Sequence, residues 1–367
     1  MILGPAKQRF RSLDGLRGIC AITIVLLHSE LLFNAGAIFC HGYLAVDVFF
    51  MLSGFVIAAS YEARLADSLN AWSFLKIRVR RLAPVYWAGT MLCVIAALLQ
   101  SHYQTSVSPA HVVTYGAMAF VLIPCLGQGM FAWPANPVAW TLAWEIVVNF
   151  LYAGSLRRAA SLWLLAIAAP LLALATLEAF ANPRGWSFGM TGADIGMGGL
   201  RAMPEFLIGV VLYRWHQIDG FARIPKITPL LPLAAWLVLA VLPQGLSPLL
   251  DLGVVTIAAP LLIATLLRGE AEAPAWFSPL GSMSYPLYAS HMALIWLAQH
   301  TPVFGLDRGA RPLLAAGVVL LALGVAWAIH LLFDPAARSR PTGGPTFPAF
   351  PPETTALTAC DRASKSV

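Results

Sequence analysis

The chain has 367 residues and a net charge of +6; 59% of its residues are hydrophobic, only 11% are charged, and the mean hydropathy is +0.74. A soluble globular protein carries roughly 25% charged residues, so this composition excludes a soluble globular enzyme and predicts a surface that mostly faces lipid. Because one membrane span takes about 20 apolar residues, the chain has room for about ten spans and for no large soluble domain.

Apolar runs of span length follow one another along the chain, at 16–33, 43–60, 83–100, 138–156, 160–178, 199–215, 229–243, 253–268, 284–300 and 312–333. A shorter run at 113–127 is broken by proline and glycine. With the N-terminus inside, ten crossings place 19 of the 23 basic residues in the cytoplasm, as the positive-inside rule expects, whereas an eleventh crossing at 113–127 would reverse every later loop. The sequence therefore predicts an all-α membrane protein, a bundle of about ten transmembrane helices with a re-entrant or interfacial segment near 113–127.

The two ends of the chain are both expected in the cytoplasm. Basic residues before the first apolar run resemble a signal peptide, but no convincing cleavage site follows, so we expect a retained first span. Residues 1–335 form the predicted transmembrane domain, and the Pro-, Gly-, Thr- and Ser-rich stretch 336–367 is predicted to be a disordered cytoplasmic tail. The five cysteines lack metal-site spacing, and the basic residues lie between apolar runs, so neither a metal nor a nucleic-acid partner is predicted.

Ionisable side chains inside the apolar runs are the first functional candidates, because each costs a few kcal/mol or more in a bilayer unless it is paired or hydrated. They are His28, Asp47, Glu145, Glu205 and His291, with Arg17 and Arg201 near opposite edges. Arg17 and His28 are eleven residues apart, which is three helical turns plus about 20°, so both share one face, and a rise of about 16 Å takes His28 to mid-bilayer. A neutral imidazole there can accept a proton; the alternative is a core histidine bonded to a neighbouring helix.

A basic cluster opens the third span, with Lys76, Arg78, Arg80 and Arg81. Arg78 and Arg81 are three residues apart and share a helix face. Two guanidinium groups on one face suit a ligand rich in phosphate, although a plain positive-inside anchor would have the same sequence.

The acidic candidates are open to more than one interpretation. Glu145 could orient an imidazole, hold a sugar hydroxyl, or pair with Arg201 or another intramembrane cation. Asp47 begins the second span near the outer face, where it could simply cap the helix.

These elements together resemble the acyltransferase-3 family of membrane O-acyltransferases, from about residue 11 to 335. Five stretches in the family's order carry the resemblance: 13–18 followed by His28 (Arg-x10-His), 42–55 with Asp47, 78–81 (Arg-x-x-Arg), 140–142 with Glu145, and 284–288 with His291 (Ser-Tyr-x-x-Tyr-x-x-His). The acidic-Pro-x-Arg element that often ends the family's last helix is kept only loosely, at 334–338. The soluble domain of some relatives does not follow, so all chemistry is expected within the bundle.

The resemblance implies transfer of an acyl group, commonly acetyl, from cytoplasmic acyl-CoA to a hydroxyl of a cell-surface or lipid-linked carbohydrate, in a bacterial inner membrane. It implies His28 as general base, Arg17, Arg78 and Arg81 as ligands of the donor phosphates, and Glu145 as a second catalytic candidate. Acceptor-binding or supporting roles fall to Asp47, Trp140, Tyr288, His291 and Arg201. No bound cofactor is implied, because acyl-CoA is a substrate. We expect His28 to share one cavity with the arginines.

Two other functions fit a bundle with buried polar groups. A proton-coupled transporter or flippase of a glycan or lipid would use the buried histidine and glutamate as a relay, but no inverted repeat is visible. A membrane scaffold without activity would leave the intramembrane polar groups costly and without use.

Overall fold

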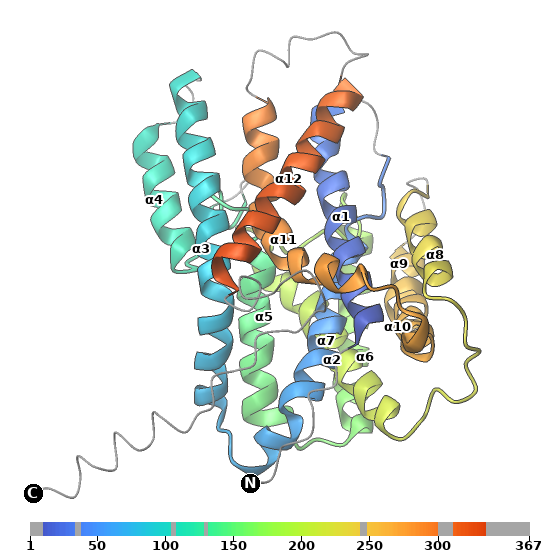
Figure 1. The fold of residues 1–367 in the computed structure, drawn as a ribbon. Helices are drawn as coiled ribbons and strands as arrows, with labels where there is room; N and C mark the ends of the chain where they lie inside the picture. Colours follow the sequence, from blue (N-terminus) through green and yellow to red (C-terminus); the bar gives the residue numbers. More distant parts are fainter. Residues whose placement is uncertain are drawn as a thin grey trace, which may run out of the picture.

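A computed structural model describes residues 10–33, 38–103, 108–127, 131–242, 248–299 and 311–334. The regular secondary structure of these residues is helical; they contain no strand, only one isolated antiparallel bridge between Phe131 and Thr191. The predicted tail at 336–367 lies outside them. The helices are α1 Arg11–Phe33, α2 Leu44–Asp67, α3 Ala71–Tyr103, α4 Pro109–Phe120, α5 Ala139–Leu151, α6 Ser161–Ala181, α7 Gly198–Gln217, α8 Leu230–Ala240, α9 Pro248–Gly253, α10 Ala259–Arg268, α11 Phe277–Gln299 and α12 Arg311–Phe333, with π-helical turns at Tyr152–Leu156 and Val254–Ala258 (Figure 1).

Seven of the described helices are long and apolar enough to cross a membrane: α1, α2, α3, α6, α7, the continuous helix formed by α9 and α10 through their π-helical turn, and α12. The chain is therefore an integral, multi-pass membrane protein. The predicted number of about ten is not reached by these seven, because α8 is short, and because α5 and α11 carry polar side chains among their apolar residues, including Glu145 and Asn149 in α5 and serines, tyrosines and a histidine in α11.

Two helix pairs, α1 with α11 and α2 with α7, form the centre of the bundle. Glycine allows both pairs to approach closely. A Cβ on Gly18 of α1 would lie 2.2 Å from Leu280 Cγ of α11, and one on Gly54 of α2 would lie 1.9 Å from the carbonyl oxygen of Phe206 on α7. Both distances are shorter than any van der Waals contact. A side chain at either glycine would therefore force the two helices apart.

The long helix α3 has α4 packed beside its C-terminal half (Figure 1). The end of α4 lies against the middle of α3, where Tyr86 and Trp87 donate hydrogen bonds to the carbonyl groups of Ala119 and Phe120. The following helix α5 then runs beside the N-terminal half of α3, with the rings of Trp72 and Phe150 6.3 Å apart. Thus α4 and α5 in succession cover the length of α3.

The N-terminus of α1 is capped from a distant part of the chain. Glu270, in the turn between α10 and α11, accepts hydrogen bonds from the backbone N–H groups of Arg11 (2.5 Å) and Ser12 (3.0 Å) and from the Ser12 hydroxyl. A carboxylate at this position satisfies amide groups that have no partner within the helix and interacts favourably with the helix dipole. It also fixes α1 against the start of α11.

The loop between α6 and α7 is held by Asp194, which accepts hydrogen bonds from the N–H and hydroxyl of Thr191 and from Arg184. Burial raises the pKa of this carboxyl, but the hydrogen bonds and the guanidinium outweigh it and leave the pKa below its ordinary value. The ordered loop carries Trp186 and Phe188 into the bundle, where both are buried.

Candidate active site

A cavity of about 170 Å³ lies between α1, α2, α3, α5 and α11. One part of its wall is strongly polar, with Arg17, Ser53, Arg78, Arg81, Thr141, Glu145, Ser284, Tyr285 and Tyr288. The remainder is apolar and includes Val46, Phe49, Phe50, Leu52, Leu82, Val138 and Leu142. The structure thus gathers all three arginines that the sequence assigned to the donor, together with Glu145 and Tyr288.

The three arginines differ in how much of their charge is already matched. Arg81 is exposed and makes no hydrogen bond or ion pair with the described residues. Arg17 is half-buried, donates to Ser284 Oγ (3.1 Å) and lies 3.7 Å from Asp14. Arg78 is buried and paired with Glu145. Unmatched positive charge therefore belongs mainly to Arg81 and Arg17.

Glu145 is held by two neighbours within the cavity. Its Oε1 lies 2.5 Å from Arg78 Nη2 and accepts a hydrogen bond from Ser53 Oγ at 3.1 Å. Of the partners considered from sequence, an intramembrane cation is the one that the structure provides, and it is Arg78, not Arg201. No hydrogen bond joins Glu145 to His28 or to any other imidazole among the described residues.

The predicted base His28 forms a pair with His291. Its Nδ1 lies 2.8 Å from His291 Nε2, and the two rings are nearly parallel, at 14°. Arg17 contacts Ser284 and His28 contacts His291, so both α1 residues lie on the face that packs against α11, as their spacing predicted. The two helices run in the same direction from the arginine end to the histidine end.

Tyr288 stands between the cavity and the histidine pair. Its hydroxyl is hydrogen-bonded to Thr141 Oγ1 (3.0 Å), and its ring lies 5.8 Å from that of Phe49 and 5.9 Å from that of His291. His28 and His291, both in the described part of the chain, do not line the cavity, whereas Tyr288 and Phe49 do. The expectation that His28 shares the cavity with the arginines is therefore not met in this conformation, in which Tyr288 lines the cavity and its ring lies beside that of His291.

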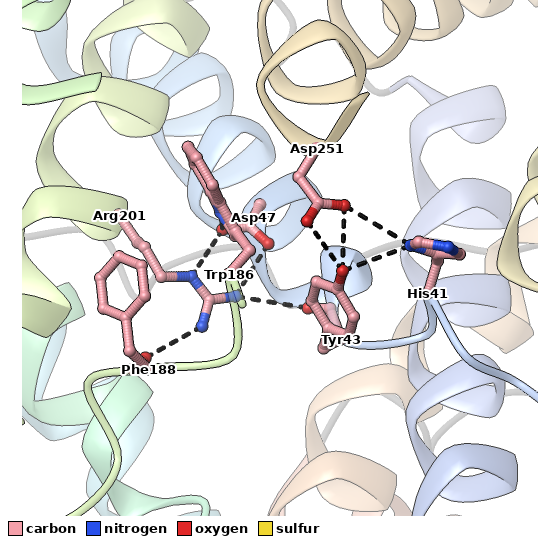
Figure 2. Close-up of polar contacts among 7 residues, drawn as sticks. All are labelled: His41, Tyr43, Asp47, Trp186, Phe188, Arg201 and Asp251. Atoms are coloured by element: carbon pink, nitrogen blue, oxygen red, sulfur yellow. Dashed lines mark hydrogen bonds and ion pairs between the residues drawn. The ribbon is translucent and has the colours of Figure 1, made fainter. Parts of the chain in front are cut away.

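Asp47 and Arg201 form a separate, fully buried ion pair (Figure 2). Arg201 Nε and Nη2 lie 2.9 and 2.8 Å from the two carboxylate oxygens of Asp47, and Arg201 also donates to the carbonyl group of Phe188. The guanidinium lies 5.2 Å from the ring centre of Trp140. The Asp47 side chain thus joins α2 to α7, and the helix-cap interpretation is wrong: the N-cap of α2 is Tyr43, which forms no side-chain capping bond.

A second cluster of polar residues adjoins this pair and was not predicted from the sequence. Tyr43 donates its hydroxyl proton to the carboxylate of Asp251 on α9 (2.9 Å), His41 Nδ1 lies 3.5 Å from the same carboxylate, and the Tyr43 carbonyl accepts from Arg201 (3.4 Å; Figure 2). Asp251 lies just before the apolar run at 253–268, so it was not among the ionisable residues found inside the apolar runs. Ser53, Thr141 and Ser284 were also given no role, although each lies within one of the motif stretches.

Glu205, on α7 one turn after Arg201, is buried beside the ion pair of Asp47 and Arg201 and interacts with both side chains. It does not line the cavity. No hydrogen bonds in the described part of the chain lead from it to the pair of His28 and His291. A chain of bonded histidine and glutamate, which a proton-coupled transporter would use as its relay, is therefore not formed in this structure.

The comparisons with known proteins define the class. The chain matches the acyltransferase-3 family, described as an acyltransferase domain, over residues 10–331. It therefore belongs to this family and is a membrane-embedded acyltransferase, which confirms the resemblance seen in the motifs.

Two relatives are similar over part of the chain. One is protein 2 in the picA locus of Rhizobium radiobacter, 35% identical over 193 residues, which are 47% of this chain and 96% of the relative. The other is the exopolysaccharide production protein ExoZ of Rhizobium meliloti (strain 1021), 32% identical over 123 residues, which are 34% of this chain and 37% of the relative. No solved structure matches the chain.

Proposed function

We propose that this protein transfers an acyl group, in the first instance acetyl, from acyl-CoA to a hydroxyl group of a cell-surface or lipid-linked carbohydrate, with His28 as the general base. The observation that carries the proposal is the alignment along α1 and α11. Arg17 and Ser284 lie at the cavity, and His28 and His291 lie eleven and seven residues further along the same two helices. The proposed phosphate-binding residue and the proposed base therefore follow one another along the same pair of helices.

The charge of the cavity supports a phosphorylated donor. Arg78 and Glu145 neutralise each other, so the lining keeps a positive charge from Arg81 and a partly matched one from Arg17. Arginine binds phosphate oxygens through paired N–H groups. The apolar part of the wall, including Val46 and Leu142, is suited to the less polar acyl end of the donor.

The carbohydrate acceptor is supported by a relative. ExoZ is by name an exopolysaccharide production protein, and a polymer of sugars offers many hydroxyl groups to an acyltransferase. Membrane-bound acylation of an exopolysaccharide or of its lipid-linked precursor agrees both with the name of this relative and with the activity of the family. We propose the bacterial inner membrane as the location, since such precursors are assembled there.

The reaction requires two proton transfers through His28 and one change of ring position. Tyr288 moves aside so that the thioester reaches His28. The imidazole takes the proton of the acceptor hydroxyl as the hydroxyl oxygen attacks the thioester carbonyl; the C–O bond forms, the C–S bond breaks, and the leaving CoA thiolate takes the proton from the imidazolium of His28. General base catalysis contributes typically 10²- to 10⁴-fold, and positioning of the two substrates contributes much of the remainder.

Ten crossings with both termini in the cytoplasm remain the topology that we propose. The described spans supply seven, and α8, α11 and the succession of α4 and α5 supply three more. Helix α8 is about as short as α4, but it ends at the loop between α1 and α2, where the carbonyl group of Ala240 accepts a hydrogen bond from the N–H group of His41. A helix of 12 residues such as α4 is about 18 Å long, less than a hydrocarbon core of about 30 Å. Its end beside the middle of α3 agrees with a segment that does not cross alone.

The direct test uses purified protein with labelled acetyl-CoA and a panel of glycans, comparing wild type with His28→Ala. We expect label on the glycan with wild type and none with His28→Ala. The matched control is His111→Ala, since His111 lies on α4, stacks on Tyr115 and does not line the cavity. Full transfer by His28→Ala would remove His28 from the mechanism, and transfer to no glycan by wild type would contradict the carbohydrate acceptor. Mass spectrometry of surface glycans from cells with and without the gene identifies the sugar.

A further inference from the structure

The hydrogen bonds of His291 decide which nitrogen of His28 is free. His291 Nδ1 lies 2.9 Å from the carbonyl oxygen of Tyr288 and 3.2 Å from that of Leu287. A carbonyl oxygen can only accept, so Nδ1 of His291 carries a hydrogen. His291 is fully buried, and the neutral imidazole is favoured where an unpaired charge would be costly. Its Nε2 therefore carries a lone pair and no hydrogen.

The same argument applies to the ring of His28. His291 Nε2 is 2.8 Å from His28 Nδ1. Since the former is an acceptor, His28 Nδ1 must be the donor and carry the hydrogen. In a neutral His28 the other nitrogen, Nε2, then keeps its lone pair. This places the basic atom of His28 on the side of the ring directed away from His291.

We infer that His291 is the positioning residue of a two-histidine base, in which it fixes His28 as the Nδ1–H tautomer and presents Nε2 as the atom that takes the acceptor's proton. This inference rests on the proposed function for its catalytic meaning. His291 takes the part that a carboxylate plays in a Ser-His-Asp triad, where the third group orients the base and stabilises its protonated form. Its own orientation comes from the carbonyl groups of Leu287 and Tyr288, which are fixed by α11.

The arrangement also explains why no carboxylate is needed beside the base. When His28 becomes imidazolium, its Nδ1–H remains bonded to the lone pair of His291 Nε2, and the proton can shift along this bond. The positive charge is then shared between two rings, and the second is bonded to two carbonyl groups. In the described part of the chain, the cavity's only carboxylate, Glu145, is occupied by Arg78.

Nitrogen NMR of the protein with ring-¹⁵N histidine, in detergent, tests the tautomer without any substrate. The His28 signals are assigned by their loss in His28→Ala. We expect His28 Nδ1 to be protonated and Nε2 unprotonated in wild type, and this preference to be lost in His291→Phe, which keeps the size of the ring and removes its nitrogens. A wild-type His28 protonated at Nε2 and bare at Nδ1 would overturn the inference.

Transfer kinetics provide the second arm. In His291→Gln the amide oxygen can accept the His28 Nδ1–H, so this variant should keep at least tenfold more kcat than His291→Phe, which should lose roughly 10²- to 10⁴-fold. The KM for acyl-CoA should stay within about twofold in both variants, because neither His291 nor His28 lines the cavity. Equal losses in the two variants, or a loss confined to KM, would contradict the role. If wild type transfers no acyl group, the proposed function fails, while the NMR result still decides the tautomer.

Discussion

At the scale of single residues, the pair of Arg78 and Glu145 controls the charge of the cavity. Both side chains are largely removed from solvent, and their 2.5 Å contact is reinforced by Ser53. Removing one partner of a buried ion pair leaves an uncompensated charge and typically costs about 3–5 kcal/mol. If the donor is acyl-CoA, as proposed, its phosphates would supply the missing negative charge and would compete with Glu145 for the Arg78 guanidinium.

Glu145→Gln is therefore expected to bind CoA more tightly than wild type, by about three- to tenfold, because Arg78 is released to the phosphates. Isothermal titration with CoA measures the change, and Glu62→Gln is the control, since Glu62 pairs with Arg214 outside the cavity. The variant should also be less stable without CoA and regain stability when CoA is added. Unchanged CoA affinity together with complete loss of transfer would instead favour a catalytic role for Glu145.

The ring of Tyr288 is the second residue-scale feature with a measurable consequence. Its hydroxyl is hydrogen-bonded to Thr141, and its ring lies beside that of Phe49. We propose that this bond keeps the thioester away from the histidine pair until an acceptor is bound. Without this hydrogen bond, a more mobile Tyr288 ring would let water and the donor thioester reach the histidine pair together.

Thr141→Val removes the hydroxyl and keeps the branched shape, so it should raise the hydrolysis of acetyl-CoA without acceptor by a few-fold. Release of free CoA, followed with a thiol reagent, measures this rate. Thr114→Val on α4 serves as control, because the Thr114 hydroxyl bonds only to its own helix, at the carbonyl group of Ala110. Hydrolysis at the wild-type rate would show that Tyr288 does not hold back the reaction.

At the scale of helices, the crossing of α2 and α7 is fixed by backbone contact. A Cβ on Gly54 or Gly209 would lie 1.9 Å from a carbonyl oxygen of the other helix, and such an oxygen cannot rotate away. The buried pair of Asp47 and Arg201 joins the same two helices near the N-terminus of each. Close approach and ion pairing together set the position of α2, which lines the cavity with Phe49 and Ser53.

Gly54→Ala is expected to destabilise the protein by about 1–3 kcal/mol or more, because the added methyl forces the helices apart. Gly317→Ala on α12 should cause no loss, because a Cβ there meets nothing within 4 Å and alanine is the better helix former by about 1 kcal/mol. Thermal unfolding in detergent can be followed with a thiol-reactive dye, because Cys20, Cys40, Cys93 and Cys125 are all buried. Equal midpoints for the two variants would mean that the crossing is not tightly packed.

At the scale of the whole molecule, the sequence predicted what depends on local geometry. The helical class follows from span-length apolar runs, and the common face of Arg17 and His28 follows from the helical repeat alone. The partners of these groups could not be predicted, because His28 meets a residue 263 positions away and Asp47 one 154 positions away. Such contacts depend on how distant helices pack, and hydropathy carries no information on that packing.

The number of spans was difficult for a related reason. An apolar run shows that a segment avoids water, but it does not distinguish a helix that crosses the bilayer from one that stops halfway. The structure ends α4 at Phe120 beside the middle of α3, and α5 continues beside the other half. The polar side chains of α11 lower its hydropathy, since Ser284, Tyr288 and His291 are hydrogen-bonded to residues of other helices in the bundle.

Labelling of single introduced cysteines with a membrane-impermeant thiol reagent tests this topology. Ser68 lies in the turn after α2, at the end of the bundle that carries Arg78, whereas Ile38 and Pro183 lie in the loops before α2 and after α6; all three are exposed. If the arginine end faces the cytoplasm, spheroplasts should be labelled at Ile38→Cys and Pro183→Cys, and at Ser68→Cys only after permeabilisation.

Two other labelling patterns are informative. Labelling of Ser68→Cys in intact spheroplasts would put the arginines outside, away from cytoplasmic acyl-CoA, and would contradict the proposed donor. Protection of Pro183→Cys while Ile38→Cys is labelled would mean that 113–127 crosses the membrane alone, because one additional crossing between α3 and α5 reverses every later loop. The expected pattern requires an even number of crossings from α2 to α6, which the succession of α4 and α5 as a single crossing provides: α2 inward, α3 outward, α4 with α5 inward, and α6 outward again leave Pro183 on the same side as Ile38.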